Sequence, residues 1–126
     1  MGTGTSLGRV RGLGSAKEGA HHWWMQKLTA GTNLALMAWL MISIARRPGY
    51  DFGSLHAWVS SAWVAVPLIL LIASVFYHFR LGLQVVIEDY AHDASRVALL
   101  IALNVFTVAT AGTAIFAILK IAFGAN

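Results

Sequence analysis

Three long apolar segments constrain this chain more than any other feature of its sequence. They run over about residues 28–45, 55–87 and 97–123, with short polar stretches between them. A bilayer core is crossed by about 20 apolar residues in a helix, so each segment is long enough to span it. Because lipid offers the backbone no hydrogen-bond partner, such segments form helices. The sequence therefore predicts an all-α fold with three transmembrane helices.

The composition supports a chain that lies mostly in lipid. Of its 126 residues, 58% are hydrophobic and 11% are charged, whereas a soluble domain carries roughly a quarter charged residues. The absence of cysteine excludes disulfides and thiolate metal sites. Four net positive charges are too few and too scattered for a nucleic-acid surface. We expect one membrane-anchor domain over residues 1–126, with residues 1–26 as a cytoplasmic tail rich in Gly and Ser.

The distribution of basic residues predicts the orientation. One side would hold six of them and the other three: Arg9, Arg11, Lys17, Lys27, Arg80 and Arg96 against Arg46, Arg47 and Lys120. The positive-inside rule then places the N-terminus in the cytoplasm and the C-terminus outside. The second segment is longer than a bilayer requires, so we expect it to tilt or extend beyond the lipid, with a bend at Pro67.

The third segment carries many small residues: Ala102, Ala109, Ala111, Gly112, Ala114 and Ala117, with Thr107, Thr110 and Thr113 among them. Small side chains let helix backbones approach closely in lipid, where packing replaces the hydrophobic drive. This face therefore either closes a compact bundle within the chain or docks against another membrane chain.

The stretch "YHFRLGLQVVIEDYAHD", residues 77–93, concentrates costly polar groups at the end of the second segment. At helical spacing, His78 shares a narrow stripe with Ser74 and Gly82, one turn away on each side. Small neighbours would leave room for a flat macrocycle, and haem iron commonly takes an axial histidine. The alternative is a neutral histidine hydrogen-bonded to a neighbouring helix. The other histidines lie at segment ends, so a second haem ligand would come from a partner chain.

Asp89 and Tyr90 follow His78 by about 11 residues, some 16 Å along a helix axis, and so lie near the membrane surface. A tyrosine hydroxyl beside a carboxylate suits the carbonyl of a quinone head group, which also needs protons on reduction. The alternative is an interfacial tyrosine next to a solvated acid.

The stretch "GAHHWWMQKLTAG" opens the first segment. Trp23 and Trp24 are typical of the aromatic belt at a membrane surface. His21, Lys27 and Thr29 lie at the predicted cytoplasmic mouth, where they can meet an anionic group such as a haem propionate or lipid head groups.

Together these residues resemble a known family, the smaller hydrophobic membrane-anchor chain (the "D" chain) of succinate dehydrogenase, respiratory complex II. The resemblance rests on His78, Gly82, Asp89 and Tyr90 in the pattern H-x3-G-x6-D-Y, on the three-span layout, and on "SAKEGAHHWWMQKLTA", which is similar to alphaproteobacterial members.

The resemblance implies roles for individual residues. His78 corresponds to an axial ligand of haem b, shared with a histidine of the larger anchor chain. Tyr90 corresponds to the tyrosine that hydrogen-bonds a ubiquinone carbonyl, with Asp89 as the acid beside it. Lys27 stands where relatives often carry an arginine near the haem propionates. It keeps the charge but loses the bidentate fork, and His21 would lie near the same propionates.

The family also implies a non-catalytic subunit of an enzyme of the tricarboxylic acid cycle and respiratory chain. Its partners would be a flavoprotein that oxidises succinate, an iron–sulfur subunit and the larger cytochrome b anchor chain, in the inner membrane of a bacterium. Two alternatives stay open: the anchor of a fumarate reductase, and a haem-free membrane scaffold or assembly protein.

Overall fold

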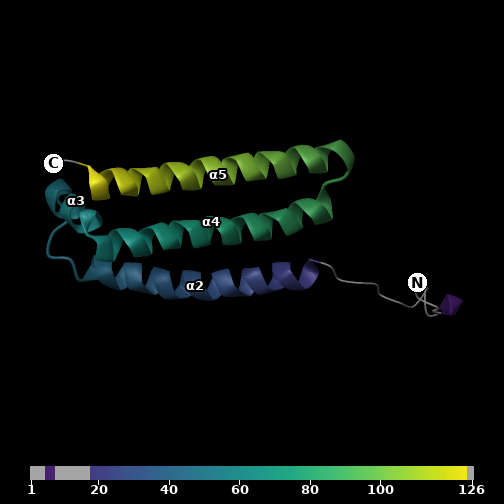
Figure 1. Ribbon diagram of the computed structural model, residues 1–126, viewed down its shortest axis with the longest axis horizontal. Helices are drawn as coiled ribbons and strands as arrows, with labels where there is room; N and C mark the ends of the chain where they lie inside the picture. The colour runs from purple at the N-terminus through teal and green to yellow at the C-terminus, as the bar shows by residue number, and fades with distance from the viewer. Residues whose placement is uncertain (1–4, 8–17, 125–126) are drawn as a thin grey trace.

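The computed structural model describes residues 5–7 and 18–124, and the fold of this part of the chain is helical (Figure 1). Four helices follow one another: α2 (Gly19–Ala45), α3 (Phe52–Ser60), α4 (Ala62–Tyr90) and α5 (Asp93–Phe123). Of these, α2, α4 and α5 are long and apolar enough to cross a membrane. The predicted all-α fold with three spans is confirmed.

The three long helices lie side by side with α4 in the middle (Figure 1). Neighbouring helices run antiparallel, because residues near the start of α2 meet the second half of α4, and those in turn meet the first half of α5. Over the described residues, α2 and α5 make no contact with each other. The helices therefore form an open layer, and the compact internal bundle considered from the sequence does not form within this chain.

The second apolar segment differs from the single helix expected over 55–87. It is divided at Ser61, whose extended backbone ends α3 and begins α4. Pro67 then falls early in α4, where its missing N–H removes only one backbone hydrogen bond near the helix start. The sequence predicted a bend at Pro67, whereas the helix is interrupted six residues before it. The short α3 packs across the end of the layer against α4 and α5.

The first segment also extends further than expected. Helix α2 begins at Gly19, so residues 19–26 of the predicted tail are helical. The rest of that tail lies largely outside the described residues, and its cytoplasmic location stays a prediction.

Most side chains of the layer face outward. Only 6%, 17% and 11% of the most apolar windows of α2, α4 and α5 are buried. The buried apolar residues are Val64, Ala65, Leu71, Leu81, Ile87, Leu103 and Ile118, most of them on the central helix. Such outward apolar faces need lipid or other membrane helices around them. A methyl group at Gly112 on α5 would meet nothing within 4 Å, so the small-residue face of α5 is open there.

The connections hold the ends of the layer. Between α2 and α3, the Arg47 guanidinium donates to the carbonyls of Gly49 and Ser54 and lies 5.0 Å from the Trp58 ring centroid.

Between α4 and α5, only Ala91 and His92 intervene, and Asp93 has a φ of 52°. Aspartate is among the few side chains that adopt this left-handed conformation readily. The sharp turn ends α4 directly after Tyr90.

Candidate functional site

The predicted haem ligand His78 lies in the second half of α4, where α4 meets α2. Its Nδ1 atom is 3.0 Å from the hydroxyl oxygen of Thr29 on α2. Thr29 is 7% exposed, one of two buried polar residues in the described part of the chain. The same hydroxyl reaches back to its own helix, 2.8 Å from the Met25 carbonyl and 3.1 Å from that of Gln26. The histidine is thus hydrogen-bonded to a neighbouring helix, as one of the two sequence hypotheses expected.

The stripe on which His78 lies faces α2. Ser74, one turn before it, donates to the Thr29 carbonyl at 3.4 Å. At Gly82, one turn after it, an added methyl group would lie 3.8 Å from the Gln26 amide nitrogen, an ordinary contact. The expected open space beside Gly82 is therefore taken up in part by α2. The small residues of the stripe serve the close approach of the two helices.

The surroundings of His78 fit a haem that takes one of its iron ligands from this chain. Among the described residues, His78 Nε2 has no hydrogen-bond partner, while Nδ1 is engaged by Thr29. A histidine that binds a metal through one nitrogen usually has the other held by a hydrogen bond. The other described histidines lie elsewhere: His21 and His22 in the first turn of α2, His56 in the short α3, and His92 between α4 and α5. A second axial ligand would have to come from another chain.

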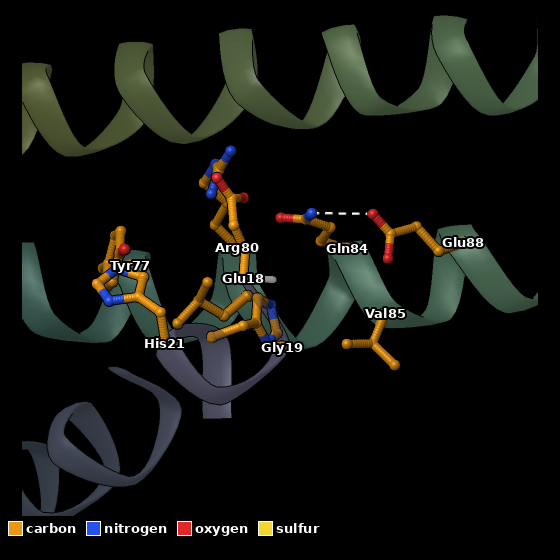
Figure 2. Close-up of a pocket in the computed structure, with 10 residues that line it drawn as sticks. Glu18, Gly19, His21, Tyr77, Arg80, Gln84, Val85 and Glu88 are labelled. Atoms are coloured by element: carbon orange, nitrogen blue, oxygen red, sulfur yellow. Dashed lines mark hydrogen bonds between the residues drawn. The ribbon is translucent and has the colours of Figure 1, made fainter. Parts of the chain in front are cut away.

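A polar pocket of about 490 Å³ lies beside this site, between the start of α2 and the second half of α4 (Figure 2). Its lining includes His21, Tyr77, Arg80, Gln84 and Glu88. Gln84 donates to Glu88 at 2.9 Å, the dashed line of Figure 2. The pocket thus gathers basic and acidic side chains at one end of the layer, with His21 from α2 and Arg80 and Glu88 from α4.

Arg80 is tied to the third span. Its Nε donates to the side-chain oxygen of Asn104 on α5. Further along, Glu88 lies 4.0 Å from Arg96 of α5. These polar contacts join α4 to α5, and His78 joins it to α2, so α4 carries polar links to both neighbours.

The two residues predicted near haem propionates take different positions. His21 lines the polar pocket together with Arg80. Lys27 is exposed, and its ammonium lies 5.7 Å from the centroid of the Trp23 ring. It lies two positions before Thr29, about 200° around the helix, and so on the opposite face of α2 from the contact with His78.

Asp89 and Tyr90 are the last residues of α4, and both are exposed; Tyr90 is 82% exposed. Within the described part of the chain neither side chain forms a hydrogen bond, so the tyrosine hydroxyl is available to a ligand. The proposed backing of Tyr90 by Asp89 does not take the form of a hydrogen bond between them here.

The sequence did not predict two features of this site, the contact of Thr29 with His78 and the place of Gln84 in the pocket. It placed Thr29 among residues facing an anionic group at the membrane surface, whereas the hydroxyl meets His78. It gave Gln84 no role, and Gln84 lines the pocket. For Thr29 no signal in the sequence could have found the contact, because helical spacing shows which residues share a face of α2 but not which face of α4 they meet.

Comparison with known proteins adds a decisive observation. Residues 1–114 match the model of a family described as succinate dehydrogenase/fumarate reductase transmembrane subunit. The chain belongs to this family. A succinate dehydrogenase hydrophobic membrane anchor subunit of Rickettsia bellii (strain RML369-C) is 32% identical over 103 residues, covering 81% of this chain and 82% of that protein. Its counterpart in Paracoccus denitrificans is 31% identical over 116 residues, covering 92% and 90%.

No solved structure shows a significant match to the chain. Membership of the transmembrane subunit family, together with three spanning helices, makes the chain a multi-pass membrane protein and part of an enzyme complex. The resemblance found in the sequence, including its alphaproteobacterial character, is confirmed by these relatives.

Proposed function

We propose that this chain is the anchor of a succinate dehydrogenase and contributes His78 Nε2 as one axial ligand to a haem b between two anchor chains. The observation that supports this most is the pairing at His78. One ring nitrogen is held by Thr29 at 3.0 Å, and the other has no partner among the described residues. The second ligand would come from the larger cytochrome b chain. When bound, the haem would supply a one-electron carrier in the membrane.

The open layer of helices supports a shared site. A haem held between helices of two chains needs helix faces that are not closed by the chain itself, and α2 and α5 do not contact each other here. The flavoprotein would oxidise succinate, and the iron–sulfur subunit would carry the electrons to the membrane face. This chain would hold both on the cytoplasmic membrane.

We propose further that Tyr90 donates a hydrogen bond to a ubiquinone carbonyl, with Asp89 beside it as an acid. Their exposure at the end of α4 supports this role, because a quinone head group can reach the hydroxyl without displacing an internal partner. His21 fits the propionate role better than Lys27 does. It shares a pocket with Arg80, whereas Lys27 lies on the other face of α2.

The experiment is to replace His78 by Ala in the complex purified through a tag on this chain, and to record the haem absorption spectrum. The proposal predicts loss of the haem signal. The matched control is His56→Ala in α3, which should keep it, because that histidine lies at the other end of the layer. A His78→Ala complex that retains the low-spin haem spectrum would contradict the ligation.

A further inference from the structure

The hydroxyl of Thr29 has three hydrogen-bond partners within reach but only one proton. Two of the three are backbone carbonyl oxygens, of Met25 at 2.8 Å and Gln26 at 3.1 Å, and these can only accept. Threonine in a helix commonly donates to the carbonyl three or four residues before it. With its proton directed to the carbonyls, the hydroxyl oxygen presents lone pairs to His78 Nδ1 at 3.0 Å. The contact is then a hydrogen bond only if Nδ1 carries the proton.

We infer that Thr29 is a positioning residue that fixes His78 as the Nδ1-protonated tautomer and thereby directs the Nε2 lone pair to an iron ligand. This inference rests on the proposed ligation of haem by His78. In a neutral imidazole one nitrogen is a donor and the other an acceptor, so a proton on Nδ1 leaves Nε2 as the acceptor. The opposite tautomer would turn Nδ1 into an acceptor and would require Thr29 to give up both carbonyl contacts.

The location of Thr29 strengthens its hold on the tautomer of His78. The residue is 7% exposed, and Ser74 on α4 reaches its carbonyl, so water has little access to the contact. A hydrogen bond in a water-poor setting is electrostatically stronger than one in water. The bond also fixes the rotation of the ring, since it ties Nδ1 to a point on a neighbouring helix.

The expected consequence is a change in the haem's reduction potential. A hydrogen bond donated from the ligand's remote nitrogen makes the imidazole a stronger base, which stabilises ferric over ferrous iron. Losing such a partner typically alters metal affinity by about 10- to 100-fold. At the lower figure, a tenfold loss of preference for the ferric form raises a one-electron potential by about 59 mV.

Four variants of the purified complex test the inference. Thr29→Val removes the hydroxyl at nearly constant shape, and Thr29→Ser restores it. Thr32→Val is the matched control, because Thr32 makes the same back-bond on the same helix, to Leu28 at 2.9 Å, but meets no histidine. His78→Ala tests the ligation itself. The measurements are haem content, spectroelectrochemical potential and the low-spin electron paramagnetic resonance spectrum.

The inference predicts a raised potential and an altered resonance spectrum for Thr29→Val, with Thr29→Ser and Thr32→Val close to the parent. If the Thr29→Val complex loses haem outright, retention of haem by the Thr29→Ser complex still supports the inference. An unchanged potential and spectrum in Thr29→Val would overturn it, as would haem loss in both Thr29 variants, which would mark a packing role. Where His78→Ala keeps the haem signal, the proposed ligation fails and the inference fails with it. If His78→Ala loses haem while Thr29→Val keeps the parent potential and spectrum, the inference is refuted and the proposed ligation stands.

Discussion

Replacing Tyr90 by Phe isolates one hydroxyl at the proposed quinone site. Tyr90 is 82% exposed at the end of α4 and its hydroxyl has no partner in the described part of the chain, so the change removes no internal contact. An exposed substitution of this kind alters stability within about 0.5 kcal/mol. A hydrogen bond to a quinone carbonyl contributes about 0.5–1.5 kcal/mol. At about 1.4 kcal/mol per factor of ten, kcat/KM for quinone should fall roughly 2- to 12-fold.

The assay is succinate-dependent quinone reduction by the purified complex over a range of quinone concentrations. Reduction of an artificial acceptor that takes electrons from the soluble subunits should be unaffected in Tyr90→Phe. The matched control is Tyr50→Phe, because the Tyr50 hydroxyl donates to the Ile44 carbonyl at 2.9 Å at the opposite end of the layer. The reasoning is refuted if Tyr90→Phe leaves kcat/KM for quinone at the parent value, or if Tyr50→Phe lowers it equally.

Two further predictions concern the scaffold. Asn104→Leu removes the acceptor of Arg80 and should destabilise α4–α5 packing by about 0.6–1.7 kcal/mol. A double-mutant cycle with Arg80→Met, measured by thermal unfolding, should give a coupling energy of that size. A coupling energy of zero would contradict the prediction. At the start of α3, hydrogen bonds from Ser54 lower the pKa of Asp51 below 3.8. This cap is fully present above pH 3.8 and is lost as the pH falls through the lowered value. The protection of the Ser54 amide, its exchange rate relative to that of an unstructured amide at the same pH, should therefore fall at low pH, whereas Asp51→Asn, which caps without titrating, should show little such change.

The sequence was sufficient for the class of fold and for the number of spans. Long apolar segments of low charge permit few structures in lipid, so the helices and their approximate limits follow from composition and length. The break at Ser61 was missed, although Ser60 and Ser61 interrupt the apolar run there and serine is a preferred N-cap residue. Pro67 indicated a disturbance, and the structure has the interruption before it.

The site was predictable in its parts and less so in its arrangement. Helical spacing correctly grouped Ser74, His78 and Gly82 on one stripe, since that depends on one helix only. Which neighbour the stripe faces depends on the rotation of α2 against α4, which their sequences do not specify separately. The contact between Thr29 and His78, and the opposite placement of Lys27, therefore required the packed structure.

The central claim is that this chain anchors a succinate dehydrogenase on the membrane. The most direct test is to purify it through a tag in mild detergent and to measure succinate-dependent quinone reduction by the eluate. The account predicts that a flavoprotein and an iron–sulfur subunit elute with the chain and that the eluate reduces quinone with succinate. A chain that elutes without these subunits, in a preparation with no such activity, would contradict it.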